Sequence, residues 1–143
     1  MLLGEYEHTL DEKNRLTLPA RLRRSFVDGV FVTRGVDGCL EAYTRPDWER
    51  LVSERLATLD SMSKQGRRLK RFFFTGAVEA ELDRQGRFML PAALLEHAGL
   101  GREVVVAGLH DHLEIWDRAR WREELTAVEG GAEDAAERLA DRD

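Results

Sequence analysis

A tandem internal repeat is the feature of this sequence that most limits its fold. The segment from Leu10 to Ala20 reappears from Leu82 to Ala92 at a constant offset of 72 residues. After one extra residue in the second copy, the similarity continues at an offset of 73. Such self-similarity indicates that one supersecondary unit is built twice. We expect a first repeat with a linker helix in residues 1–60, a connecting segment in 61–75, a second repeat in 76–128, and a charged, flexible tail in 129–143.

Each copy has the pattern of a tight hairpin followed by a short helix. Residues 5–10 are strand-like, residues 11–14 are typical of a turn, and residues 15–18 alternate polar and apolar. At the turn, Asn14 aligns with Gly86, and these two residue types best tolerate a positive φ. The sequence also predicts helices at 20–26, 47–59, 92–98 and from 119 onward, and strands at 30–34, 40–43, 103–107 and 113–116.

A unit of about 50 residues is poor at burying a core of its own. Two copies can pack their sheets together about a pseudo-twofold axis and share one core. The sequence therefore predicts one duplicated α+β domain rather than two independent domains.

Composition and charge limit the classes of protein. The chain has 143 residues, 43% hydrophobic and 34% charged, which is typical of a soluble globular protein. No apolar run is long enough to span a bilayer, and the N-terminus has no secretory pattern, so we expect a cytoplasmic protein with no membrane partner. The net charge of −5 divides into +3 in residues 1–75 and −8 in 76–143, so a basic face could still meet phosphate. Cys39, the single cysteine, excludes an intrachain disulfide.

The repeated motif Leu-Asp-x-x-x-Arg-[Leu/Phe]-x-Leu-Pro-Ala resembles that of the MraZ family of bacterial transcriptional regulators. The resemblance covers roughly residues 1–128, and the paired motif places Asp11 with Arg15 and Asp83 with Arg87. The second copy also resembles the single hairpin unit of the wider AbrB-like group, whose chains interleave hairpins to bind DNA. The expected fold is therefore a duplicated AbrB-like swapped-hairpin β-barrel with flanking helices.

The resemblance implies a function as well as a fold. MraZ-like proteins form rings, usually of eight or twelve subunits, and bind short direct repeats of double-stranded DNA upstream of their own gene. They act mainly as repressors of the cell-division and cell-wall gene cluster and associate with the nucleoid. The resemblance implies no cofactor.

The Asp-x-x-x-Arg motif carries the candidate site. An aspartate that opens a turn can accept backbone N–H bonds, and we assign Asp11 and Asp83 this stabilising role. The arginines have two possible uses. Arg15 and Arg87 can pair with their aspartates, or project toward phosphate and guanine edges, and the two uses can coexist.

Neighbouring residues favour the first turn as the DNA contact. Lys13 is basic, Asn14 can hydrogen-bond to bases or phosphate, and several arginines follow in the same positive half. Arg84 is the cation of the second turn. The basic run 67–71 is more typical of a solvated helix face than of a third contact zone.

Other residue clusters have a structural interpretation. The sequence His110-Asp111-His112 shows no third ligand nearby, so we expect a loop and no metal site. The three phenylalanines at 72–74 and the tryptophans are expected to be packing residues. No nucleophile–base pair, phosphate loop or cofactor motif is visible, so an enzyme is not expected. The remaining alternatives are a ring-forming scaffold without DNA binding and an antitoxin-type AbrB-like binder.

Overall fold

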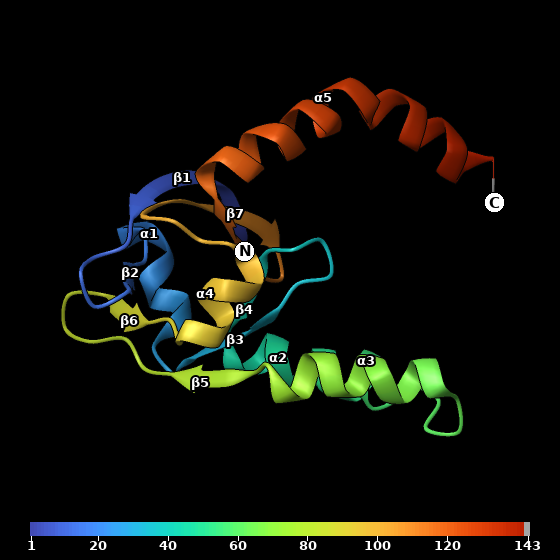
Figure 1. The fold of residues 1–143 in the computed structure, drawn as a ribbon, viewed down its shortest axis with the longest axis horizontal. Coiled ribbons are helices and arrows are strands. Elements are labelled where there is room, and N and C mark those ends of the chain that lie inside the picture. The colour runs from blue at the N-terminus through green and yellow to red at the C-terminus, as the bar shows by residue number, and fades with distance from the viewer. Residues whose placement is uncertain (142–143) are drawn as a thin grey trace.

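The computed structural model describes residues 1–141 and shows an α+β fold built from two sheets with helices around them (Figure 1). The strands are β1 (Leu2–Thr9), β2 (Arg15–Thr17), β3 (Val30–Arg34), β4 (Leu40–Tyr43), β5 (Val78–Ala80), β6 (Arg87–Met89), β7 (Glu103–His110) and β8 (Leu113–Asp117). The helices are α1 (Ala20–Arg23), α2 (Arg45–Leu51), α3 (Lys64–Thr75), α4 (Ala92–Ala98) and α5 (Arg118–Ala140), with a 3-10 turn η1 (Arg24–Phe26) and a π-helical turn η2 (Val52–Leu56).

The two repeats exchange strands. The larger sheet has the order β1-β7-β8-β4-β3-β5, so β1 of the first repeat pairs with β7 of the second, and β5 of the second pairs with β3 of the first. The smaller sheet contains one strand from each repeat, β2 and β6. The strands on either side of each predicted turn therefore pair with the other repeat, and this confirms the duplicated, swapped α+β fold.

The sheets do not close into the expected barrel within residues 1–141. Strands β1 and β5 are the two edges of the larger sheet and do not pair with each other. The closure of the core comes instead from the two-stranded sheet β2–β6 and from helices α1 and α4.

A pseudo-twofold axis relates the repeats, and the strand register locates it. In the smaller sheet, Leu16 lies opposite Phe88, its equivalent in the other repeat. In the larger sheet, Glu41 lies opposite Glu114, which is also its equivalent. The axis therefore passes through both of these pairs, with the shared core between them.

The core is formed jointly by both repeats. Leu16, Val32, Leu113 and Ile115 are fully buried, and they come from strands β2, β3 and β8 of the two repeats. Alternation along each strand determines this burial, since successive side chains point to opposite faces. Neither repeat could bury these side chains alone, as the length of the repeat predicts.

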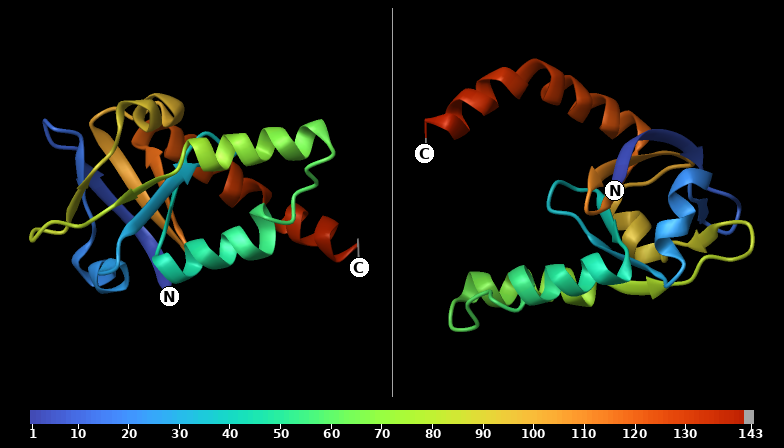
Figure 2. Two further views of the ribbon diagram at one scale, coloured as in Figure 1. Left: turned by 90° about the horizontal axis from the view of Figure 1, so that it is seen from below. Right: turned by 180° about the vertical axis from the view of Figure 1, so that it is seen from behind.

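Two helical arms extend from the same side of the sheets, opposite the turns that precede β2 and β6 (Figure 1). One arm consists of α2, η2 and α3, which run side by side (Figure 2). The other is α5. The connecting segment expected at 61–75 is thus mostly helical. Its helix, α3, is capped by Ser63, whose hydroxyl accepts a hydrogen bond from the Gly66 amide at 2.8 Å.

The sequence predicts a flexible tail from residue 129, but in the structure α5 continues as a helix to Ala140. Residues 142 and 143 of this tail lie outside the described part. Its side chains beyond residue 128 are almost all exposed. No helix among residues 1–141 is both long enough and apolar enough to cross a membrane.

Aromatic side chains anchor the arms to the sheets, as expected. The rings of Phe31 and Trp48 stack with centroids 5.7 Å apart, and Trp116 lies at the same distance from Trp121 at the start of α5. The Thr33 hydroxyl donates a 2.6 Å hydrogen bond to the carbonyl oxygen of Phe73 in α3. The predicted packing role of the aromatic residues is consistent with these contacts.

Candidate nucleic-acid interface

The first Asp-x-x-x-Arg motif forms a turn closed by its aspartate. Oδ1 of Asp11 accepts hydrogen bonds from the backbone amides of Lys13 and Arg15, both at 2.9 Å. Oδ2 of Asp11 accepts a bond from Nε of Arg15 at 2.6 Å. Asn14 takes a φ of 58° at the tip, in the left-handed region that asparagine tolerates. The carboxylate thus stabilises the turn and fixes the direction of the arginine.

The second motif repeats this geometry. Oδ1 of Asp83 accepts bonds from the amides of Gln85 and Arg87 at 2.9 Å, and Oδ2 accepts from Nε of Arg87 at 2.8 Å. Gly86 has a φ of 76° at the position equivalent to Asn14. The same chemistry therefore folds both turns.

Each tip is also tied to the opposite repeat. The carbonyl oxygen of Gly86 accepts a bond from the amide of Leu18 at 2.9 Å, and the carbonyl oxygen of Asn14 accepts one from Leu90 at 2.9 Å. These bonds continue the β2–β6 pairing to both ends. The two tips are therefore held in a fixed relation to each other.

Both predicted uses of the arginines remain open in this geometry, because only Nε is used in each ion pair. Among residues 1–141, the Nη atoms of Arg15 and Arg87 make no hydrogen bond. Their side chains are 29% and 28% exposed. The aspartate orients the guanidinium, and its outer edge remains available to another ligand.

Hydrogen bonding keeps the two aspartates ionised. The backbone amide of Arg15 is the main cause that lowers the pKa of Asp11 below its usual value of 3.8, assisted by the Arg15 side chain and the Lys13 amide. The Arg87 amide has the same effect on the pKa of Asp83. Both carboxylates are thus charged acceptors at neutral pH.

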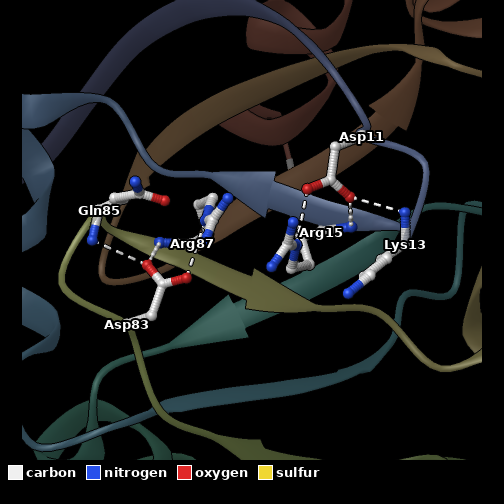
Figure 3. Close-up of polar contacts among 6 residues, drawn as sticks. All are labelled: Asp11, Lys13, Arg15, Asp83, Gln85 and Arg87. Atoms are coloured by element: carbon white, nitrogen blue, oxygen red, sulfur yellow. Dashed lines mark hydrogen bonds and ion pairs between the residues drawn. The ribbon is translucent and has the colours of Figure 1, made fainter.

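The two arginines share one face of the β2–β6 ribbon. Leu16 and Phe88 point to the core, so their neighbours Arg15 and Arg87 point to the outer face. Figure 3 shows the aspartate turns at opposite ends of the ribbon, with the two guanidinium groups between them. A two-stranded ribbon carrying two oriented arginines is the central feature of the candidate site.

The remaining predicted site residues lie around this ribbon. The side chains of Lys13, Asn14 and Arg84 are exposed at the two tips. The basic residues of the 67–71 run lie on α3, in the arm that extends away from the ribbon (Figure 1). The structure therefore gathers the five predicted DNA-contacting residues on the ribbon and separates them from the basic helix.

Strand exchange places Arg23 and Arg24, which follow the first turn in the sequence, beside the second turn. The Nε of Arg23 donates to the carbonyl oxygen of Leu18 at 2.9 Å, and its side chain crosses Gly86. Arg23, Arg24 and Arg84 line a shallow hollow of about 400 Å³ beside this turn. The corresponding hollow at the first turn contains Glu12 and Arg102 instead.

This placement identifies Arg23 and Arg24 as site residues that the sequence did not assign to the second turn. They are 60 or more positions from Arg84 in the sequence, and their equivalents in the second repeat are Leu95 and Glu96. Only the pairing of β2 with β6 brings them there. The second turn is consequently the more cationic of the two.

Comparison with known proteins was made for the whole chain. The family described as "MraZ protein, putative antitoxin-like" matches it twice, at residues 1–72 and 73–143. A protein of Roseiflexus castenholzii named Transcriptional regulator MraZ is 45% identical over 99% of this chain and 98% of its own length. Proteins of the same name from Heliobacterium modesticaldum and Pediococcus pentosaceus are 44% and 43% identical, each over at least 98% of both chains.

Strand exchange between two repeats, with an arginine-orienting turn in each, defines a duplicated swapped-hairpin protein of the AbrB-like class. Within that class, the matches to both repeats and the full-length relatives are specific. The chain belongs to the MraZ family. The names of these relatives agree with the expectation that the chain is not an enzyme.

Proposed function

We propose that this chain is a sequence-specific DNA-binding transcriptional regulator that contacts DNA through the outer face of the β2–β6 ribbon. The observation that carries the proposal is the pair of guanidinium groups of Arg15 and Arg87, each held by an aspartate and each with its Nη atoms available. Arginine binds the O6 and N7 atoms of guanine in a bidentate manner. The major groove is wide enough to admit a two-stranded β-ribbon.

The cations around the ribbon support the same proposal. Lys13 and Arg84 are exposed at the tips, and Arg23 and Arg24 lie beside the second turn. Such groups position a protein on phosphates, while base contacts specify the sequence. We assign the phosphate role to the tip cations and to Asn14, and the base-reading role to the two ribbon arginines.

The finer proposal concerns the operator and the assembly. A ribbon that neutralises only a few phosphates binds weakly at cellular salt concentrations. Several subunits bound to successive repeats would multiply their affinities through effective concentration. We therefore propose a homo-oligomeric ring of eight or twelve subunits, in the cytoplasm and on the nucleoid, that represses the cell-division and cell-wall gene cluster from short direct repeats upstream of its own operon.

Substitution of the ribbon arginines tests the DNA contact. Arg15→Ala and Arg87→Ala should each weaken binding to operator DNA at least 10-fold, about the discrimination of one bidentate contact. Two backbone bonds to each aspartate remain, so the turns should persist. Arg50→Ala is the matched control, because this arginine pairs with Asp47 on α2, in the arm. Electrophoretic mobility shift at several salt concentrations measures the effect.

The same measurement separates the regulator from a ring-forming scaffold. Wild-type affinity in both arginine variants, with an unchanged oligomeric state, would exclude the ribbon as the DNA contact. A scaffold without DNA binding is supported by the acidic second half, and it requires that the wild type shift no operator fragment at any salt concentration.

DNA fragments with one, two and four repeats test the multivalent proposal. The apparent affinity should rise steeply with repeat number for the ring. Equal affinity for all three fragments would contradict it. A reporter gene placed behind the natural upstream DNA then measures repression. Increased expression in the presence of the wild-type protein would show that the protein activates the operon and does not repress it.

A further inference from the structure

A second cluster of polar side chains lies on the pseudo-twofold axis, across the core from the DNA ribbon. Glu41 of β4 lies directly opposite Glu114 of β8. Their neighbours Leu40, Ile115 and Leu113 are fully buried in the core, so both glutamates project from the other face of the sheet. Duplication of one glutamate has thus placed two carboxylates side by side at the junction of the repeats.

This arrangement is unfavourable for the sheet by itself. Like charges directly opposite each other on neighbouring strands are destabilising. Both glutamates are only partly exposed, and among residues 1–141 no lysine or arginine forms an ion pair with either. The pair therefore has no lysine or arginine partner within the described residues.

A histidine completes the cluster. One ligand atom each from Glu41, His112 and Glu114 lies within 4.8 Å of the other two. The side chain of His112 is only 17% exposed, and its ring stacks on Tyr43 with centroids 5.1 Å apart. Three residues from both repeats thus converge on one point.

Each member of the cluster is oriented by a neighbour. Oε1 of Glu41 accepts a 2.8 Å bond from the hydroxyl of Tyr43, and Oε1 of Glu114 accepts a 3.0 Å bond from Nε1 of Trp116. Tyr43 and Trp116 are equivalent residues of the two repeats. Each glutamate retains a second oxygen for another ligand.

The histidine is prepared in the manner of a metal ligand. Its Nδ1 lies 2.7 Å from Oδ1 of Asp111. A carboxylate only accepts, so Nδ1 carries a proton, and in the neutral imidazole this leaves the lone pair of Nε2 for a ligand. Metal-bound histidines commonly donate their other ring nitrogen to a carboxylate, which fixes the tautomer and the ring.

We propose that Glu41, His112 and Glu114 bind one divalent transition-metal ion of the zinc class and so join the two repeats at their pseudo-twofold axis. One imidazole and two carboxylates suit such an ion, and the two negative charges match its charge. Bonds of about 2.0–2.2 Å bring ligand atoms to about 3–3.5 Å from one another, so the side chains close slightly on binding.

The sequence analysis expected no metal site at His112, because no third ligand lies near it along the chain. His110 and His112 are separated by one residue, but His110 has a φ of 74° in the tight β7–β8 turn and is not in the cluster. The missing ligand, Glu41, is more than 70 positions from Glu114. The position equivalent to His112 in the first repeat is Cys39, which is buried, so the ligand set is not symmetric.

Metal titration of the untagged full-length chain tests the proposal. After treatment with a chelator, calorimetric titration with Zn²⁺ should give one ion per chain. Mg²⁺, which prefers oxygen ligands and retains its water, should not bind comparably. Excess Zn²⁺ should also raise the Tm, because an ion that binds only the folded state stabilises it.

Single substitutions identify the ligands. Glu41→Gln, Glu114→Gln and His112→Asn should each weaken Zn²⁺ binding at least 10-fold and reduce the rise in Tm. His110→Asn is the matched control: it removes the neighbouring imidazole, and asparagine tolerates the positive φ. The glutamine variants still accept the Tyr43 and Trp116 hydrogen bonds, and they relieve the charge repulsion, so their metal-free forms should fold.

Three results would overturn the proposal: no saturable binding of one ion per chain, wild-type affinity in both glutamine variants, or equal affinity for Mg²⁺. A measurement on the wild type alone protects against a variant that fails to fold. Paramagnetic Co²⁺ should broaden amide resonances around residues 41 and 112–114, and broadening centred elsewhere would place the ion at another site. None of these readouts depends on DNA binding, so they fail or succeed independently of the proposed function.

Discussion

At the scale of single residues, one aspartate performs two tasks in each turn. Its first oxygen accepts two backbone amides and holds the bend, and its second oxygen directs an arginine outward. The ion pair and the DNA contact are therefore compatible, because they use different nitrogen atoms of the guanidinium group.

The lowered pKa values of Asp11 and Asp83 predict how these turns respond to acid. Each folded pKa lies below the usual value of 3.8, so the stability gained from the carboxylate is fully present above that pH and is lost as the pH falls through the folded pKa. The double variant Asp11→Asn/Asp83→Asn should have a lower Tm than the wild type at neutral pH, and the difference should shrink as the pH falls below 3.8 and through the lowered pKa values of the folded state.

Thermal unfolding across this pH range measures the effect. Glu12→Gln is the control, because the Glu12 side chain makes no hydrogen bond within the described residues and should leave the pH profile unchanged. A Tm difference between the double variant and the wild type that persists at low pH would contradict the assignment.

The two tips differ in the residue that takes the positive φ, Asn14 in the first and Gly86 in the second, and this difference is testable. A Cβ at Gly86 would clash with Nε of Arg23, which is held by its bond to Leu18. Gly86→Asn should therefore destabilise the fold by about 1 kcal/mol through loss of that bond, although asparagine tolerates the positive φ. Asn14→Gly, the reciprocal change, should have little effect.

Urea denaturation of a double-mutant cycle checks the cause. In an Arg23→Ala background, Gly86→Asn should cost much less than in the wild type. An equal cost in the two backgrounds would show that the contact with Arg23 is not responsible.

At the scale of elements, the β2–β6 ribbon connects stability to the candidate site. Leu16 and Phe88 are 0% and 2% exposed and lie opposite each other on the pseudo-twofold axis. Their burial fixes which face of the ribbon is outward, and hence where Arg15 and Arg87 point. The core and the proposed DNA-binding face are thus the two sides of one pair of short strands.

Removal of either buried side chain should therefore be costly. We expect Leu16→Ala to lower the free energy of unfolding by about 2–5 kcal/mol and Phe88→Ala by about 3–5 kcal/mol. Because the two residues are neighbours, the double variant should lose a different amount from the sum of the single losses. Met89→Ala is the control on the exposed face, where 60% of the side chain is accessible, and it should change the free energy little.

Chemical denaturation measures these free energies. A loss below about 1 kcal/mol for Leu16→Ala would contradict the burial of the ribbon, since fully buried leucines cost more than that when truncated.

At the scale of the whole molecule, exchange of strands makes the two repeats interdependent. Strand β1 forms its backbone hydrogen bonds with β7 of the other repeat, and β5 forms its bonds with β3. Neither repeat holds the partners of its own outer strand, and the core draws side chains from both. The chain therefore behaves as one cooperative unit despite its sequence duplication.

Division of the chain tests this interdependence. Residues 1–75 and 76–143 expressed separately should each fail to fold as a monomer, and mixing them should restore a compact complex. Circular dichroism and size-exclusion chromatography follow the outcome. A half that is folded and monomeric on its own would show that strand exchange is dispensable.

The sequence by itself determined the local features: the repeat, the four-residue turns, the positive φ at Asn14 and Gly86, and the aspartate caps. These depend on contacts between residues at most a few positions apart, so the pattern of residue types is sufficient to predict them. The same patterns determined the α+β class, because periodicity and length specify elements.

Only the tertiary structure decided which strands pair, and three results depend on that pairing. Arg23 and Arg24 lie at the second turn, the sheet stays open at β1 and β5, and Glu41 meets His112 and Glu114 on the axis. The physical reason is that burial of the shared core determines which distant strands pair. The local pattern of residues in either repeat does not specify the partner of each strand.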